Sequence, residues 1–187
     1  MTDAVKDPPC ISGTLACSLR DVVKDLLDAR AVASAMLRLP ADVRTAYETA
    51  QPIGWVPLEV MEQTFEALAN ELGTSVAELH ERVARRSIDL TMRTFWRLFL
   101  RVTTDGALVS RAPSIYARSY NRGRLESRIT TPGRGETRLL DWPQAPEWPL
   151  RGTRIGIEVS LGIAGRRNVQ ATCTRTPTGA LFIVTWR

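Results

Sequence analysis

The sequence predicts an α+β protein, in which N-terminal helices pack on a four-stranded antiparallel sheet made of two C-terminal hairpins separated by a helix. Apolar residues recur at helical spacing between residues 18 and 102, and they alternate with polar residues from residue 124 onward. Two turn sequences, Pro132-Gly133-Arg134-Gly135 and Pro177-Thr178-Gly179, each separate two alternating segments. Helices followed by antiparallel hairpins are typical of the α+β class.

The chain opens with an irregular segment and a long predicted helix. Residues 1–12 contain two adjacent prolines and no periodic pattern, so we expect a flexible or strand-like lead-in. A helix is predicted from Ser18 to about Arg38, because apolar residues recur at Leu19, Val22, Val23, Leu26 and Leu27. Ser18 and Asp21 form a start similar to a capping box.

Proline and glycine mark the ends of the next helices. Pro40 suits the first turn of a short helix that ends at about Ala50, because proline lacks the N–H that would be unsatisfied there. A third helix follows Pro57 and ends near Gly73, a residue suited to a C-terminal cap. A fourth helix begins at Thr74-Ser75.

Residues 88–102 form the most hydrophobic predicted helix. Its apolar side chains cover most of its circumference, so we expect it at the centre of the domain: Leu90, Met92, Phe95, Trp96, Leu98, Phe99 and Leu100. A stripe of arginines at four-residue spacing, Arg93, Arg97 and Arg101, interrupts this pattern. Like charges at this spacing repel, so either solvent or an acidic partner faces them.

The strands follow in the second half of the chain. The first predicted hairpin pairs Arg124–Thr131 with Glu136–Trp142, and the second pairs Val169–Thr174 with Leu181–Trp186. Between them, we expect Leu150–Ala164 to form a helix, because apolar residues recur there every four positions. A strand is the alternative, because part of this segment also alternates.

The length and the charge distribution indicate how the chain is organised. A length of 187 residues with 44% hydrophobic residues predicts one domain over residues 1–187. Residues 1–81 hold six Lys and Arg against thirteen Asp and Glu (net −7), whereas residues 82–187 hold nineteen against seven (net +12). Either the two parts neutralise each other, or the basic part faces an acidic protein or nucleic acid.

The cysteines and the apolar runs predict the compartment. Cys10, Cys17 and Cys173 lack the spacing and the histidines of a zinc site. Cys10 and Cys17 either pair or stay reduced, and an intracellular protein favours thiols. We see no signal-peptide core and no apolar run of about 20 residues. We therefore expect a soluble, cytoplasmic protein with no membrane span.

Few residues offer chemistry, so we expect no enzyme, no cofactor and no metal site. His80, the sole histidine, lies between Leu79 and Glu81 on a helix face that we interpret as outward, which favours a solvated histidine over a metal or haem ligand. The glycines lack a phosphate-binding pattern, and no serine lies in a G-x-S-x-G elbow.

A cluster of basic and aromatic residues is the densest chemical signal. It comprises Arg118, Arg122, Arg124 and Arg128, interleaved with Tyr116 and Tyr120. Such a cluster can bind phosphates or stack on bases. No helix-turn-helix, zinc-finger or RNP motif accompanies it, so a protein contact or plain surface role is favoured over nucleic acid.

Three segments carry a family resemblance that covers nearly the whole chain. They are Ile11-Ser12-Gly13, the stretch from Ile115 through Tyr120-Asn121-Arg122-Gly123, and the closing segment Gly179–Trp186. The chain resembles a large paralogous family of uncharacterised myxobacterial proteins. That family distantly resembles vinyl-reductase-type ligand-binding domains, haem nitric-oxide sensors and TRAPP subunits. The resemblance implies an apolar pocket between helices and sheet, or a dimer face.

The haem branch of this resemblance fits least well. Its Tyr-x-Ser-x-Arg motif is not matched by Tyr116-Ala117-Arg118-Ser119-Tyr120, and His80 does not match the proximal position. No cofactor is therefore carried over from the resemblance.

Two functional hypotheses follow. In the first, a sensory or regulatory module binds a small apolar ligand in a pocket lined by Phe95, Trp96, Phe99 and Trp142, although these aromatic side chains would equally well fill a core. In the second, a TRAPP-like subunit forms a homodimer or docks a protein partner, such as a GTPase-pathway protein, on an arginine-rich face. This face comprises Arg93, Arg97, Arg101, Arg118, Arg122 and Arg124.

Overall fold

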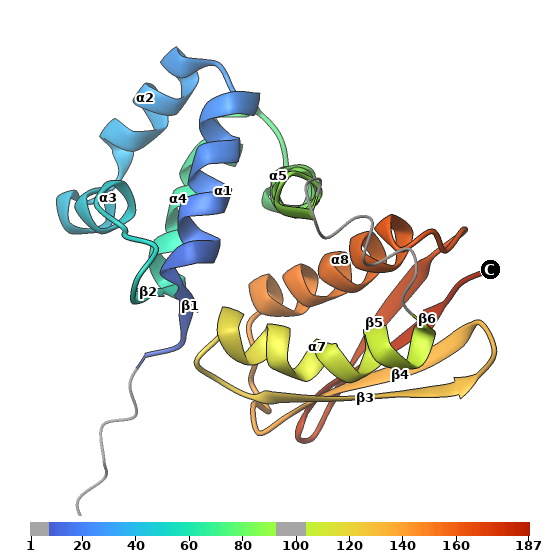
Figure 1. The fold of residues 1–187 in the computed structure, drawn as a ribbon. Helices are drawn as coiled ribbons and strands as arrows, with labels where there is room; N and C mark the ends of the chain where they lie inside the picture. Colours follow the sequence, from blue (N-terminus) through green and yellow to red (C-terminus); the bar gives the residue numbers. More distant parts are fainter. Residues whose placement is uncertain (1–7, 93–103) are drawn as a thin grey trace, which may run out of the picture. The chain divides into compact units, whose positions relative to one another are not determined.

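The computed structural model describes residues 8–92 and 104–187, which form two compact units (Figure 1). Unit 1 comprises the residues up to Val76 together with Ser119–Arg122, and unit 2 comprises Ala77–Arg118 and Gly123–Arg187. Each unit contains its own buried side chains. The expectation of a single domain over residues 1–187 stays a prediction.

Unit 1 is built from helices and one short sheet. Its helices are α1 (Gly13–Leu26), α2 (Ala29–Arg38), α3 (Ala41–Glu48) and α4 (Leu58–Leu72), and its strands are β1 (Cys10–Ser12) and β2 (Trp55–Pro57). The two strands pair antiparallel, with Ile11 opposite Val56. The predicted lead-in is therefore strand-like at Cys10–Ser12, where Ile11 is fully buried.

The long helix predicted from Ser18 to Arg38 is two helices, because capping groups interrupt it. The Ser12 Oγ accepts a hydrogen bond from the Leu15 backbone N–H at 3.3 Å, so α1 begins five residues earlier than predicted. The Asp28 carboxylate accepts from the backbone N–H groups of Arg30 and Ala31 at 2.9 and 3.1 Å and starts α2. This cap satisfies donors that a continuous helix would otherwise bond internally.

The remaining predictions for unit 1 agree with the structure. Pro40 precedes α3, and α4 ends at Gly73, whose φ of 63° is the left-handed conformation that glycine adopts without a steric penalty. The thiols of Cys10 and Cys17 donate hydrogen bonds to the carbonyl oxygens of Pro8 and Ala50, and no disulfide joins these two residues.

Unit 2 contains a four-stranded antiparallel sheet in the order β3-β4-β6-β5. The strands are β3 (Arg124–Thr131), β4 (Arg134–Leu140), β5 (Gln170–Thr176) and β6 (Gly179–Thr185). Pro177 and Thr178 join the second hairpin, with Thr176 opposite Gly179. The predicted α+β class and both hairpins are confirmed, although β4 begins two residues before the predicted Glu136.

The described helices of unit 2 are α5 (Val76–Met92), α7 (Asp105–Ser119) and α8 (Glu147–Ile163). Figure 1 shows α7 and α8 over the same face of the sheet. On that face Leu161 of α8 packs with Ala171, Val184 and Trp186, and Leu108 of α7 contacts this cluster. The segment 150–164 is thus helical. None of the helices in the described part of the chain is long and apolar enough to cross a membrane.

Two predictions for the middle of the chain need correction or stay open. Helix α7 was missed, because Gly106 and the internal Pro113 disfavour a helix locally. The burial of the Tyr116 side chain contributes compensating stability. The helix predicted at 88–102 is, up to Met92, the end of α5, and its other residues lie outside the described residues.

Candidate functional site

Most residues of the two predicted sites lie outside the described part of the chain. These are Phe95, Trp96 and Phe99 of the aromatic pocket, and Arg93, Arg97 and Arg101 of the arginine face. Trp142 is half-buried just after β4, where its backbone N–H donates to the Thr178 carbonyl oxygen at 3.1 Å. The aromatic pocket therefore stays a prediction.

The other predicted arginines divide between the two units. Arg118 and Arg124 belong to unit 2, and Arg122 belongs to unit 1. Arg124 is exposed and bonds the carboxylates of Asp141, at 2.8 Å, and Glu126.

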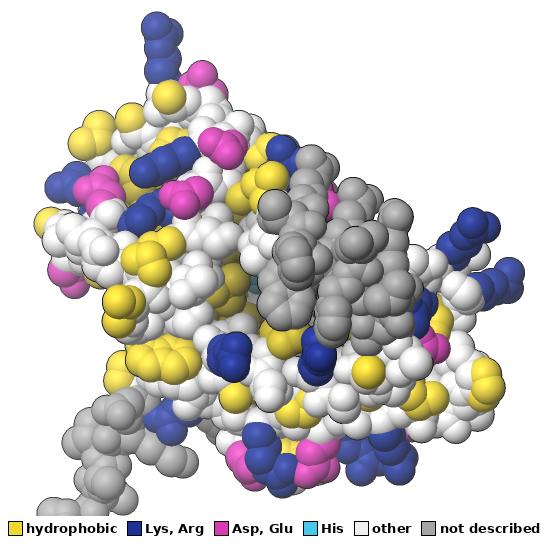
Figure 2. Space-filling view, viewed as in Figure 1, with side chains coloured by type: hydrophobic (Ala, Val, Ile, Leu, Met, Phe, Trp, Pro, Cys, Tyr) yellow, Lys and Arg dark blue, Asp and Glu magenta, His cyan; other side chains and the backbone are white. Residues whose placement is uncertain are grey.

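Neighbouring arginines of the sheet are also paired with carboxylates. Arg128 bonds Glu136 at 2.7 Å, and Arg138 lies 3.7 Å from the same carboxylate. Figure 2 shows basic and acidic side chains side by side in the region where Figure 1 places β3. Because these pairs neutralise much of the local charge, this face offers less attraction to an acidic partner than the arginine count predicts.

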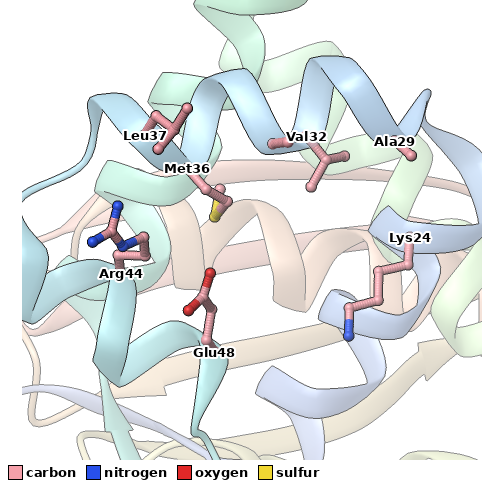
Figure 3. A pocket seen from close by; sticks show the side chains of 8 residues that line it. Lys24, Ala29, Val32, Met36, Leu37, Arg44 and Glu48 are labelled. Atoms are coloured by element: carbon pink, nitrogen blue, oxygen red, sulfur yellow. The ribbon is translucent and has the colours of Figure 1, made fainter.

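A groove of about 650 Å³ opens between the end of α1, α2 and α3 in unit 1 (Figure 3). Its lining comprises Lys24, Ala29, Val32, Ala33, Met36, Leu37, Arg44 and Glu48. This volume lies in the range of small-molecule sites in proteins.

The residue pattern of α2 explains the groove. Ala29, Val32, Ala33 and Met36 recur at helical spacing and share one face of α2. Two of these four are alanines, whose small side chains leave space beside α3. Met36 is buried, whereas Leu37 is 76% exposed, so the groove has an apolar wall that the rest of unit 1 does not cover.

Three charged side chains border this wall. Figure 3 shows Lys24 on one side of the α2 side chains, and Arg44 and Glu48 on the α3 side. Within the part of the chain that the structure describes, neither an ion pair nor a side-chain hydrogen bond joins Lys24, Arg44 or Glu48 to a protein group. Their charged ends are thus available to a ligand.

Arg20 of α1 fixes the end of α3. Its Nη1 donates to the carbonyl oxygens of Tyr47 at 2.9 Å, Glu48 at 2.8 Å and Ala50 at 3.2 Å. These carbonyls at the end of α3 carry the negative end of the helix dipole, which a guanidinium complements. Arg20 therefore holds the backbone from which Glu48 projects.

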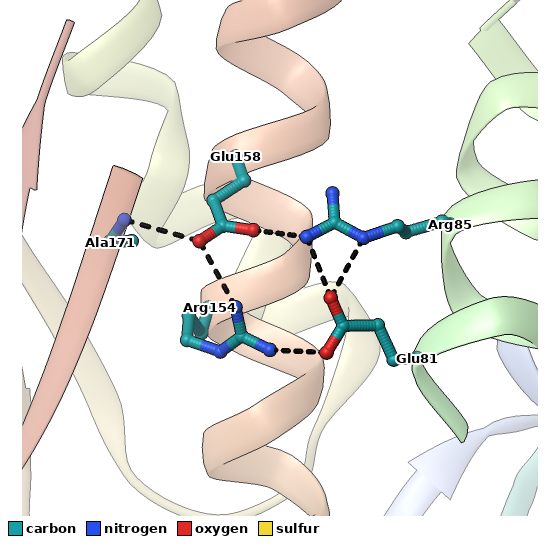
Figure 4. A network of polar contacts seen from close by, with 5 residues as sticks. All are labelled: Glu81, Arg85, Arg154, Glu158 and Ala171. Atoms are coloured by element: carbon teal, nitrogen blue, oxygen red, sulfur yellow. Dashed lines mark hydrogen bonds and ion pairs between the residues drawn. The ribbon is translucent and has the colours of Figure 1, made fainter. Parts of the chain in front are cut away.

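A closed network of charges joins α5 to α8 in unit 2 (Figure 4). Arg85 bonds Glu81 at 2.8 Å and also bonds Glu158, while Arg154 bonds Glu81 at 2.7 Å and Glu158 at 3.0 Å. Glu158 also accepts the Ala171 backbone N–H of β5 at 3.1 Å. The paired arginines help to hold the pKa of Glu81 below its ordinary value, against the opposing effect of its burial.

His80 is buried, so the expectation of a solvated histidine is wrong. The imidazole is 2% exposed and stacks on Trp148 of α8, with 3.7 Å between ring centroids and 9° between ring planes. Burial, and secondarily the positive charge of Arg151, lower the pKa of His80 to about 3. The ring is therefore neutral at physiological pH and serves as a packing surface.

The sequence analysis missed both the groove and the charge network. The network has a local signal, because Glu81 with Arg85 and Arg154 with Glu158 are four residues apart and can pair on one helix. The groove has only a partial signal, the small apolar face of α2, because the rest of its lining comes from α1 and α3, whose packing on α2 the spacing does not define.

Comparison with solved structures identifies the fold. The chain is 11% identical to an Fe(II) unliganded H-NOX protein from K. algicida, with a TM-score of 0.69 over 94% of this chain and 96% of that one. An oxygen-binding H-NOX domain related to soluble guanylate cyclases, in its oxygen complex, is 13% identical, with a TM-score of 0.60 over 94% and 92%. No protein-family model and no curated protein matches the chain. The chain thus has the H-NOX fold, and its predicted likeness to vinyl reductases and TRAPP subunits stays a prediction.

The residues of this chain do not fit a histidine-ligated haem. Haem iron is held by an axial His, Cys, Met or Tyr. The sole imidazole is only 2% exposed and is stacked on Trp148, so a haem iron could not reach it without repacking of this site. Burial raises the pKa of the Tyr120 phenol, which disfavours the phenolate that a tyrosine ligand requires. Within the described residues, no cluster of His, Cys, Asp and Glu could hold a metal ion.

Proposed function

We propose that this chain is a sensory or regulatory module that binds a small molecule with an apolar body, and that it does so without haem. The groove between α1, α2 and α3 is the observation that carries this proposal, because it combines an apolar wall with charged groups that no group in residues 8–92 and 104–187 neutralises. The likeness to H-NOX domains supports a sensory role. A cytoplasmic location and the absence of enzymatic activity remain part of the proposal.

The exposed apolar side chains of the groove give the ligand its binding energy. Leu37 is 76% exposed and Val32 is half-buried, so a ligand that covers them removes apolar surface from water. Each methylene buried in this way contributes about 0.8 kcal/mol. An eight-carbon chain is therefore long enough to offset part of the cost of association and bind weakly.

Binding of 1-octanol, a neutral probe, tests the site. We expect 1-octanol to raise the melting temperature of the full chain and to shift amide signals of α2 in a two-dimensional NMR spectrum. Ala33→Trp should abolish both effects, because an indole at this lining position fills the groove. Ala41→Trp is the matched control, because Ala41 is exposed on α3 and does not line the groove.

Two results would overturn the proposed site. One is an Ala33→Trp variant that binds 1-octanol as the unmodified chain does. The other is that neither 1-octanol nor octanoate, the carboxylate with the same chain length, changes the melting temperature or the NMR spectrum in a way that Ala33→Trp abolishes. Recovery of a haem absorption band with a histidine-ligated spectrum after incubation with hemin would refute the haem-independent part.

A further inference from the structure

We infer that the groove selects a small amphipathic molecule with one negative charge, an inference that rests on the proposed function. Two of its three charged lining residues, Lys24 and Arg44, are cationic, and the third, Glu48, is anionic. The charged lining thus has an excess of one positive charge. A monoanion with an apolar body complements both this charge and the apolar wall.

The cations belong to different helices on either side of the apolar wall. Lys24 is exposed near the end of α1, and Arg44 is half-buried on α3. Figure 3 shows that both border the row formed by Val32, Met36 and Leu37. A carboxylate near either cation leaves the alkyl chain on the α2 side chains, and the planar guanidinium of Arg44 can bond both carboxylate oxygens.

Glu48 sets the limit on the charge of the ligand. Arg20 holds the Glu48 carbonyl at 2.8 Å, so the backbone that carries this carboxylate is fixed at the α3 side of the groove. A second negative charge on the ligand would be repelled by it. Glu48 therefore discriminates against dianions such as free phosphate esters.

Three probes with the same alkyl chain separate charge from apolar contact: octanoate, 1-octanol and octylammonium. We expect octanoate to bind about three- to tenfold more tightly than 1-octanol at low salt, the range for partly exposed ion pairs. Octylammonium should bind no more tightly than 1-octanol. Because exposed charges are screened, 0.5 M NaCl should remove most of the advantage of octanoate.

Variants assign the preference to named side chains. Lys24→Met and Arg44→Met keep an apolar stem, so each should weaken octanoate about two- to fivefold and leave 1-octanol unchanged. Arg30→Met is the matched control, because Arg30 is exposed on α2 and does not line the groove. Glu48→Gln should strengthen octanoate and reduce the discrimination against octyl phosphate.

The outcomes separate this inference from the proposed function. If 1-octanol and octanoate bind equally and both are lost in Ala33→Trp, the groove is a ligand site and the inference of a monoanion is wrong. If octanoate binds more tightly but Lys24→Met and Arg44→Met behave as Arg30→Met does, the assigned cations are wrong. If neither probe depends on Ala33, the proposed function itself fails.

Discussion

His80 offers the sharpest test of the structure, because it is the sole histidine of the 187-residue chain. Its imidazole is 2% exposed and stacked on Trp148, so protonation would place a positive charge in a desolvated site. Arg151 and Arg154 add positive charge nearby, whereas Glu81 favours the protonated ring. Burial is the largest of these effects. The net result of burial and the neighbouring charges is that the pKa of His80 falls from 6.5 to about 3.

The direction and size of the pH effect follow from this pKa. Between pH 6.5 and about 3, the unfolded chain binds a proton that the folded chain excludes. The stabilising contribution of the neutral ring is therefore fully present above pH 6.5 and is lost as the pH falls. The slope is about 1.4 kcal/mol per pH unit, so lowering the pH from 6.5 to 5 should reduce the free energy of unfolding by about 2 kcal/mol.

A substitution isolates this contribution from other titrating groups. His80→Phe keeps an aromatic ring to stack on Trp148 but cannot be protonated. Urea unfolding at pH 5 and pH 7 should show the loss of about 2 kcal/mol in the unmodified chain and not in the variant. Glu62, whose pKa is raised by burial and by the charge of Glu59, is present in both proteins and cancels in the difference.

A proton NMR titration measures the same property directly. The single imidazole Cε1 proton should give one signal that is shifted by the Trp148 ring current and does not move between pH 7 and pH 4.5 while the chain stays folded. A titration midpoint near 6.5 in the folded protein would refute the reasoning, because it would mean that His80 is solvated.

Two further predictions concern the charge network and the glycines. Glu158→Gln should lower the free energy of unfolding by about 1 to 3 kcal/mol. The Glu158 side chain is only 10% exposed, and its loss of charge leaves Arg154 without one of its two carboxylates. A urea unfolding curve that matches that of the unmodified chain would contradict this role. Gly179→Ala should destabilise the chain by about 2 kcal/mol or more, because the new Cβ would lie 2.3 Å from the Leu139 carbonyl oxygen. Gly156→Ala, with nothing within 4 Å of its new Cβ inside α8, should instead stabilise by about 0.5 to 1 kcal/mol, and equal effects at the two glycines would be inconsistent with the structure.

Elements with strong local signals could be predicted from the sequence. Gly73 ends α4 because its left-handed φ of 63° is accessible to glycine, and this property is independent of tertiary structure. The turn at Thr178 likewise follows from residue types alone. The break at Asp28 was missed, although its capping group is also local. The apolar spacing continues across Asp28, so only the hydrogen bonds of its side chain to the backbone show that one helix ends and another begins there.

Functional residues were harder to predict, because their properties depend on distant partners. His80 has acidic neighbours in the sequence, which favoured an exposed position, but Leu79, Val83 and Ala84 beside it are buried as well. Trp148, which covers the imidazole, lies on another helix, so no spacing within α5 reveals it. Histidine is intermediate in burial preference, and its local pattern therefore decides little.

The two units use their charges in different ways, and this difference supports the proposed ligand site. In unit 2 the guanidinium groups of Arg85 and Arg154 each meet two carboxylates, so they have little residual capacity for a ligand. In unit 1 no described protein group pairs with Lys24 or Arg44, although an apolar wall lies between them. Closed networks hold helices together, whereas uncompensated charges beside exposed apolar side chains give affinity to a molecule that carries both features.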